Sequence, residues 1–298
     1  MINLAALRFR RIFAEQGGPI DRIETVDIAV ADRRLFQANA FLRPDLQPPA
    51  AKRTVYSDAA GSGTDASPMV ARNMAISEAL ERWAYAATAV SDRRAIYGFD
   101  VDPMSNGMAA FPGLFARQAR PTAYLEAVER FSIIAWWEGM LPTLSKPTPW
   151  KDIRAAVIWA EPDAVVAIVY KRTAEGLYAY GHAAARNFEA ACRKAVVELA
   201  RHEYVIRSYW LARTGSGGQP ATPSDLLERR SVHFASEEGH EEFVRRIQSA
   251  PTETLAPRRI AFDGEIPGPW SRYAPVWRVV FHPVTKRYLT NDERYFLW

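Results

Sequence analysis

The alternation of apolar and polar residues in the first half of the chain predicts one strand followed by two long helical stretches. Residues 23–29, "IETVDIA", alternate and then run apolar, which is typical of a strand. The region from 69 to about 90 contains nothing that breaks a helix, and Ser67 followed by proline is a typical N-cap. A second helical stretch, from about 114 to 140, contains Pro121, where we expect a kink or a break.

The pattern then changes to strands. Residues 153–160 and 164–172 are rich in β-branched and apolar residues and are joined by Glu-Pro-Asp, a turn sequence, and residues 176–184 pair naturally with the second strand. We expect a third helix over about 187–210. The glycine- and serine-rich segment 213–225 is predicted to be a mobile loop.

The last part of the chain carries mixed signals. "SDLLERRSVHF" and "SEEGHEEFVRRIQSA" have helical patterns, and "PVWRVVFHP" (275–283) predicts a late strand. The alternating βαβ pattern and the GxGxxG motif of a Rossmann domain are missing. We therefore predict an α+β fold in which long helices pack on antiparallel strands. Residues 50–298 form a single domain in this interpretation, and residues 1–49 are an N-terminal extension integrated with it.

Composition and charge narrow the possible functions. The 298 residues carry a formal charge of +4 but no long Lys/Arg block, which suits a small anionic ligand such as a nucleotide better than nucleic acid. Cys192 is the single cysteine, so no intrachain disulfide or thiolate metal cluster can form, and the five histidines show no HExxH spacing. Charges interrupt every apolar run before the roughly 18 residues that a membrane span needs, so we expect a cytoplasmic protein.

One five-residue pattern, Glu-x-x-Glu-Arg, occurs twice, 126 − 78 = 48 residues apart, in "SEALERW" and "LEAVERF". On a helix its charged positions i, i+3 and i+4 share one face. The simplest interpretation is a Glu–Arg pair on a solvated helix, worth about 0.3–0.5 kcal/mol. The two copies place their charges at Glu78, Glu81 and Arg82, and at Glu126, Glu129 and Arg130.

Two observations favour a binding site over simple surface pairs. Both helical stretches are otherwise rich in large apolar residues, and buried carboxylates are costly unless a cation compensates them. Each stretch also follows a glycine, serine or asparagine loop (57–68 and 103–113) of the kind that cradles anions. Four carboxylates need more positive charge than two arginines supply. Magnesium, which prefers oxygen ligands, fits, and phosphates would bridge the ions and the arginines.

These segments resemble the YcaO family. "GSGTDASPMVARNMAISEALERW" resembles its first nucleotide motif, and "SNGMAAF" followed by "LEAVERFSIIAWWEGMLP" resembles the second. "VVAIVYKRTAEGLYAYGHAAARNFEAACRKAVVELARHE" is similar to its later strand–strand–glycine–helix segment, and "PVWRVVFHP" to its late strand. The order matches from about residue 50 to 285.

The resemblance implies the YcaO-like fold and an ATP- and Mg2+-dependent enzyme that modifies backbone amides of a ribosomally made peptide. In that family ATP phosphorylates the amide oxygen. The peptide's own Cys, Ser or Thr then attacks to give an azoline, its amine gives an amidine, or external sulfide gives a thioamide. The resemblance further implies a precursor peptide as substrate, a separate leader-binding or E1-like or TfuA-like partner protein, and a homodimer, with neither nucleic acid nor membrane as partner.

The resemblance also assigns roles to individual residues. Magnesium would be held by Glu78, Glu81, Glu126 and Glu129, and phosphate oxygens by Arg82 and Arg130, because Arg is a forked donor. Loop contacts to phosphate are expected from Ser62, Ser105 and Asn106. This chain departs from the family pattern at several positions: among them, it carries Ser62 for a lysine, Met74 for a serine and Gln118 for a ligand carboxylate, and "ERYFLW" lacks the Pro-x-Pro-x-Pro tail of azoline-forming members.

Those departures keep a second hypothesis open, a catalytically silent YcaO-fold subunit that scaffolds the real enzyme. Acid–base chemistry on a sugar is a third, supported only by the carboxylates. Five further residues receive other interpretations. Cys192 and the pair Trp136 and Trp137 are interpreted as core residues, and His182 as structural. Arg278 is left open between the site and the strand surface.

Overall fold

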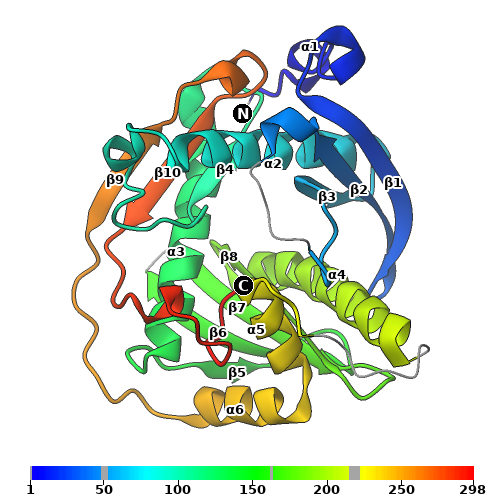
Figure 1. Ribbon diagram of the computed structural model, residues 1–298. Helices are drawn as coiled ribbons and strands as arrows, with labels where there is room; N and C mark the ends of the chain where they lie inside the picture. The colour runs from blue at the N-terminus through cyan, green and yellow to red at the C-terminus, as the bar shows by residue number, and fades with distance from the viewer. Residues whose placement is uncertain (1, 48–52, 162–163, 215–221) are drawn as a thin grey trace.

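The computed structural model describes residues 2–47, 53–161, 164–214 and 222–298, and these residues form an α+β fold with three antiparallel sheets (Figure 1). The first sheet has the order β1 (Ile20–Val30), β2 (Arg33–Leu42), β3 (Gly61–Asp65). The second has the order β4 (Met108–Ala110), β10 (Val276–Phe281), β9 (Ile260–Glu265). The third has the order β5 (Leu144–Lys146), β6 (Arg154–Glu161), β7 (Ala164–Arg172), β8 (Tyr178–Ala185).

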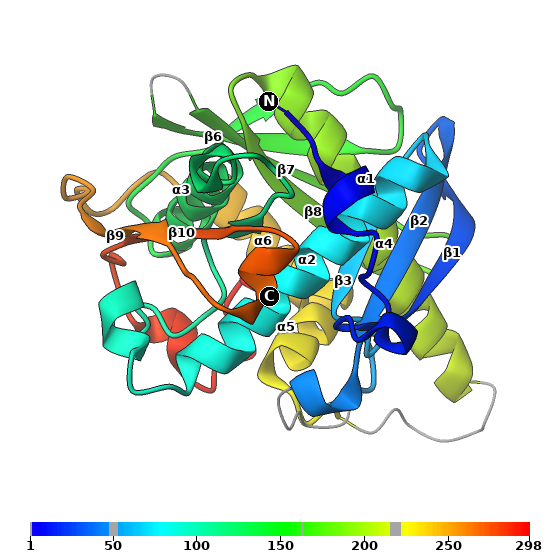
Figure 2. The ribbon, with the colours of Figure 1, turned by 90° about the horizontal axis from the view of Figure 1, so that it is seen from above.

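The helices connect and cover these sheets. The α-helices are α1 (Ala5–Arg8), α2 (Pro68–Ala89), α3 (Arg120–Trp137), α4 (Phe188–Thr214), α5 (Leu226–Ala235) and α6 (Glu237–Gln248). Short 3-10 turns are η1 (Ala14–Gln16), η2 (Pro44–Leu46), η3 (Arg94–Tyr97), η4 (Ala116–Gln118), η5 (Pro269–Arg272) and η6 (Arg287–Leu289). Helix α2 packs on the first sheet and α4 on the third, while α3 lies between the second and third sheets (Figure 2). No helix in the described part of the chain is long and apolar enough to cross a membrane.

The backbone of helix α2 lies directly against the backbone of β3 in the first sheet, because glycine and alanine residues form the contact. A Cβ on Gly61 would stand 2.3 Å from the carbonyl oxygen of Ala75, and one on Gly63 would stand 2.1 Å from that of Ala71. Helix α4 approaches β8 in the same way, since a Cβ on Gly181 would stand 2.1 Å from the carbonyl oxygen of Ala195. Glycine is therefore required where these helices cross their strands.

Helix α5 fixes two distant segments through two buried charges. The carboxylate of Glu228 accepts backbone N–H bonds from residues 54–56, at 2.9–3.0 Å. The guanidinium of Arg230 donates to the carbonyl oxygens of Tyr288, Thr290, Asp292 and Leu297. Both side chains are 1% exposed. Because a buried charge without partners is very costly, these bonds tie the chain before β3 and the C-terminal segment to one helix.

Most predicted elements are confirmed, with shifted ends. Helix α2 begins after Ser67, whose hydroxyl accepts the Val70 N–H, as predicted. The second helix is shorter than expected: it begins at Arg120, so Pro121 occupies its first turn and causes no kink. The predicted loops 57–68 and 103–113 contain short strands, because β3 and β4 complete the edges of sheets that start elsewhere in the sequence.

Several strands of the structure were missed by the sequence analysis. Strands β2, β5 and β9 were not predicted, and β2 is the central strand of the first sheet. Because β1 and β2 join β3, residues before 50 supply most of that sheet. The boundary at residue 50 remains a prediction. The predicted turn at 162–163 and residues 215–221 of the predicted mobile loop lie outside the described residues.

The close contact at Gly63 generates a prediction. Gly63→Ala should lower the free energy of unfolding by about 1–3 kcal/mol, because the new methyl group collides with the backbone of α2. Gly264→Ala, also in a strand, is the matched control, since its methyl would meet only the ring of Phe262, at 3.0 Å. Urea denaturation of both variants measures the difference. Equal losses would contradict the backbone-contact explanation.

The Glu228 anchor generates a second prediction. Burial opposes ionisation of Glu228, but the N–H groups of residues 54–56 hold its pKa below the ordinary value. Its stabilisation is therefore complete above the unfolded-state pKa of about 4.3 and is lost as the pH falls through the lower folded-state pKa. Glu228→Gln should cost about 2 kcal/mol at pH 7 and less near pH 3. Denaturation at both pH values tests this, and exposed Glu241→Gln should change neither.

Candidate functional site

The two Glu-x-x-Glu-Arg motifs lie on α2 and α3 and face one another. Each motif fits its helix because the charged side chains share one face, while neighbours such as Ala79 and Val128 are fully buried on another. The motifs are close enough to affect each other's ionisation: Glu126 raises the pKa of Glu81, and Glu78 raises that of Glu126. The structure therefore brings the six charged residues of the motifs into one cluster.

Three of the four carboxylates are anchored by backbone N–H groups, each from a strand of a different sheet. Glu78 accepts from Ser62 N in β3 at 2.9 Å. Glu126 accepts from Met108 N in β4 at 3.1 Å, and Glu129 from Ala184 N in β8 at 2.9 Å. The cluster therefore lies where the three sheets meet.

The fourth carboxylate, Glu81, is the exception. Its side chain is buried, and within the described residues it accepts no hydrogen bond. Burial, and then the charge of Glu126, raise the pKa of Glu81 well above its ordinary value. Burial also raises the pKa of Glu126, to about 7, with Arg130 opposing the shift. A pair of buried carboxylates held in this way favours a cation between or beside them.

The two arginines of the motifs are held at the same place. Arg82 forms an ion pair with Glu78, with 3.7 Å between Nη2 and Oε1, and its Nη1 donates to the hydroxyl of Ser105. Burial opposes the charge of Arg82, but the glutamates around it raise its pKa. Arg130 donates from Nη1 to the carbonyl oxygen of Trp298 at 3.1 Å, and its buried Nε has no partner among the described residues. Both guanidinium groups thus keep donor capacity for an anion.

A cavity of about 1040 Å³ opens beside the cluster. Five of the predicted site residues line it: Ser62, Glu78, Arg82, Glu129 and Arg130. One wall of this cavity is the outward face of the first sheet, a polar row formed by Gln37, Asn39, Ser62 and Thr64. In this row the hydroxyl of Ser62 donates to Asn39 Oδ1 at 2.8 Å, and Gln37 donates to the same oxygen at 3.2 Å. The cavity thus combines charged and neutral polar walls.

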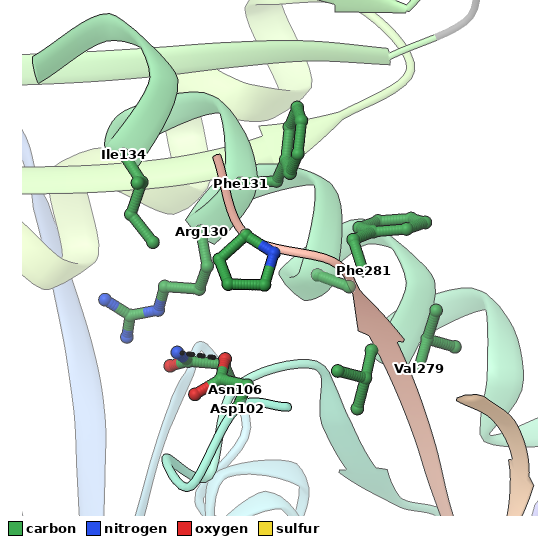
Figure 3. Close-up of a pocket in the computed structure, with 10 residues that line it drawn as sticks. Asp102, Asn106, Arg130, Phe131, Ile134, Val279 and Phe281 are labelled. Atoms are coloured by element: carbon green, nitrogen blue, oxygen red, sulfur yellow. Dashed lines mark hydrogen bonds between the residues drawn. The ribbon is translucent and has the colours of Figure 1, made fainter. Parts of the chain in front are cut away.

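The loop before β4 carries two further predicted residues. Asn106 donates to Asp102 at 3.0 Å, and both line a small pocket of about 20 Å³, room for about one water molecule, into which Arg130 also projects (Figure 3). Arg278 holds this loop by donating from Nη2 to the carbonyl oxygens of Asp102 and Met104, at 2.6 and 3.1 Å. Ser105 is in this way set beside Arg82.

Two residues do not fit their sequence-based interpretation. Gln118 does not join the cluster: it caps η4 by accepting from Phe115 N at 3.0 Å and lines neither pocket. Its helical turn ends before α3 begins, so the register counted back from Glu126 along one helix does not apply. His182 was interpreted as structural, but it lies on the cavity wall with its Nδ1 2.8 Å from Glu129 Oε1. Burial opposes ionisation of Glu129, yet the bond to His182 lowers the pKa of that carboxyl.

The other singled-out residues belong to the core. Cys192 is buried, and burial raises the pKa of its thiol. Trp136 is 1% exposed and packs edge-to-face against Phe243 and Phe296. Arg278 lies on neither surface nor cavity: it is fully buried, stacks over the Phe99 ring, and burial lowers its pKa to about 10.

Metal binding by protein side chains alone is not supported. In the part of the chain that the structure describes, no group of three or more His, Cys, Asp or Glu side chains is arranged to hold a metal ion. The carboxylates available are hard oxygen donors. Magnesium in nucleotide sites is commonly held by one or two carboxylates together with phosphate oxygens, so this donor set fits magnesium that arrives with a nucleotide.

Sequence reasoning missed several residues that line the cavity. Asn39 and Gln37 alternate with buried Ala38 and Ala40 along β2, a period-two signal that could have been found had the strand been predicted. Arg193 and Lys194, on α4, also line the cavity. Their position on a helix with other charged residues gives no such signal.

Comparisons with known proteins place this arrangement in a known fold. No family model matches the chain, and no curated protein matches its sequence. It is similar to the structure of YcaO from Methanopyrus kandleri bound with AMPPCP and Mg2+, with 15% identity, a TM-score of 0.54, and coverage of 97% of this chain and 91% of that one. It is also similar to the E. coli microcin synthetase McbBCD complex with pro-MccB17 bound, with 12% identity, a TM-score of 0.54, and coverage of 87% and 86%. The resemblance found in the motifs is thus confirmed for the fold: this chain has the YcaO fold.

Proposed function

We propose that this chain is an ATP-dependent enzyme that activates backbone amides of a ribosomally made peptide by O-phosphorylation. The observation that carries the proposal is the pair of Glu-x-x-Glu-Arg motifs, which meet across α2 and α3 beside one large cavity. A solvated salt-bridge pair would not require burial of Glu81 or three backbone anchors for its neighbours.

Each charged residue has a role that its surroundings support. Magnesium would be held by Glu78, Glu81, Glu126 and Glu129, which supply oxygen ligands and carry more negative charge than two arginines offset. Arg82 and Arg130 would grip phosphate oxygens, because both retain free donor positions at the cavity. Ser62, Ser105 and Asn106 would complete the contacts to phosphate. Gln118 has no role in this arrangement, since its side chain bonds to Phe115 N and to the carbonyl oxygen of Ile2 instead of the cluster.

The reaction needs positioning more than a protein nucleophile. Bound Mg–ATP would supply the γ-phosphoryl group to the amide oxygen, which then leaves as phosphate after attack by a nucleophile of the peptide or by external sulfide. Cys192 is buried in the core and does not line the cavity, in agreement with a nucleophile from the substrate. Azoline, amidine and thioamide products all follow from this step. The mass of the modified peptide separates a loss of water from replacement of oxygen by sulfur.

The two similar structures support the proposed nucleotide, magnesium and protein partners. One is bound with AMPPCP and Mg2+, and the other is a complex of several proteins with a peptide, pro-MccB17. By analogy we propose a precursor peptide as substrate and a separate leader-binding, E1-like or TfuA-like protein as partner. A homodimer of this chain is part of the same proposal.

A second candidate function is a catalytically silent subunit of a peptide-modifying complex. It is favoured by Ser62, which has a neutral hydroxyl where the family has a lysine. This hydroxyl already donates a hydrogen bond to Asn39. The position of Gln118 outside the cluster also favours it, because its side chain is bonded to the main chain of Phe115 and Ile2. Nucleotide binding distinguishes the two functions.

Calorimetry with AMPPCP and Mg2+ tests the proposal directly. The wild-type chain should bind the nucleotide in a magnesium-dependent manner. Glu81→Gln and Glu129→Gln should each weaken binding at least about tenfold, because each removes an anionic oxygen ligand. Glu241→Gln, an exposed substitution on α6, is the matched control and should bind as the wild type does.

The outcomes separate the hypotheses. Absence of binding at millimolar nucleotide would overturn the enzyme proposal and favour the silent subunit. Wild-type affinity in both glutamine variants would show that the motifs form simple salt bridges and do not bind the nucleotide.

Stability without metal gives an independent prediction. Glu81→Gln should raise the free energy of unfolding in EDTA by about 1 kcal/mol at pH 8, because it removes a buried carboxylate that faces Glu126 without a hydrogen bond. A residue kept at a cost to stability is typical of a functional site. Urea denaturation measures the change. Destabilisation by this substitution would show that Glu81 serves the fold rather than a ligand.

A further inference from the structure

The cavity is larger than the predicted nucleotide site requires. Its volume of about 1040 Å³ reaches the upper end of the range of roughly 300–1,000 Å³ that is usual for one small ligand. The residues proposed for magnesium and phosphate come from α2, α3, β3 and the loop before β4. Another wall is formed by α4, with side chains of Ala190, Arg193, Lys194, Val197, Glu198 and Arg201. This wall is available to a second ligand.

Two cations on the α4 wall have no partner. Arg193 and Lys194 are exposed to the cavity, and among the described residues neither forms a hydrogen bond or an ion pair. The neighbouring carboxylate, Glu198, is already paired with Arg201, whose Nη1 lies 2.8 Å from it. Arg201 also donates from Nε and Nη2 to the hydroxyl of Thr64 and so joins α4 to the first sheet. The charges of Arg193 and Lys194 are therefore left uncompensated.

The other carboxylates that line the cavity are mostly engaged. Glu78 and Glu129 bind Ser62 N, Arg82, Ala184 N and His182, as described above. Glu228 binds residues 54–56, and Asp225 caps α5 by accepting from Glu228 N at 3.0 Å. Asp58 remains, exposed on the loop before β3. The cavity thus offers an open anion site on α4, separate from the arginines of the two motifs.

We infer that Arg193 and Lys194 form a subsite for a carboxylate side chain of the peptide substrate. The inference rests on the proposed function and names its substrate class: peptides with an acidic residue near the amide to be modified. An arginine fork and a lysine ammonium next to one another bind carboxylates through charge-assisted hydrogen bonds. Partial enclosure in the cavity strengthens those bonds relative to the open surface.

Fluorescence anisotropy with two labelled peptides tests the subsite. The first probe is a nine-residue Gly/Ser peptide with a central Cys flanked by four Asp or Glu residues, and the second carries Asn or Gln at those four positions. Both are titrated with and without AMPPCP and Mg2+. The acidic peptide should bind about tenfold more tightly, and its affinity should fall with added salt.

Two double variants show where the preference arises. Arg193→Gln with Lys194→Gln should abolish the preference while leaving AMPPCP binding unchanged by calorimetry. Arg33→Gln with Arg34→Gln removes the same charge from the exposed start of β2, outside the cavity, and should retain the preference. Both pairs are exposed, so both double variants are expected to fold.

The outcomes also separate this inference from the proposed function. Equal binding of the two peptides, or a preference that survives in the α4 variant, would overturn the subsite. Loss of AMPPCP binding in the α4 variant would assign the two cations to the nucleotide, which overturns the subsite and leaves the ATP-dependent function in place. A preference for the acidic peptide in a wild-type chain that binds no nucleotide would support the subsite and overturn the ATP-dependent function.

Discussion

Burial of like charges is the constraint around which this molecule is organised. Glu81 and Glu126 are carboxylates whose burial opposes their ionisation; the charge of Glu126 further raises the pKa of Glu81, and the charges of Glu129 and Glu78 raise that of Glu126. Such a pair persists only where the surroundings hold it in place. The three sheets provide this support, because each directs a backbone N–H at one glutamate of the cluster. The three sheets therefore pack around a group of buried carboxylates, and a bound cation would reduce the repulsion between them.

Helix α5 also carries buried charged side chains that bind main-chain groups, and these fix other parts of the cavity. Glu228 and Arg230 lie two residues apart and carry opposite charges, and their side-chain hydrogen bonds to other described residues go to main-chain groups or to the hydroxyl of Thr54. One holds the segment that enters the rim of the cavity, and the other holds the segment that ends at Trp298 on its wall. The cavity owes its shape to these two buried charges as well as to the sheets. Packing of apolar groups alone would leave both segments without fixed partners.

The sequence analysis succeeded where local signals agree with the final structure. The N-cap at Ser67 and the spacing of Glu78, Glu81 and Arg82 depend on residues within one helix, so both could be predicted. Strand β3 could not, because "GSGTD" has the composition of a loop and becomes a strand only by pairing with β2. The roles of His182 and Gln118 likewise depend on contacts across the fold. Neither the bond of His182 to a glutamate 53 positions earlier nor the turn that diverts Gln118 has a local signature.

The anchoring of the glutamates has a consequence for how this fold tolerates change in sequence. Glu78, Glu126 and Glu129 are held by main-chain N–H groups of residues 62, 108 and 184, and any amino acid except proline supplies that donor. The anchoring bonds therefore do not depend on which side chain stands at these strand positions, although Met108 and Ala184 also pack in the core. A chain can thus keep these three anchoring bonds while the residues that supply the N–H groups change.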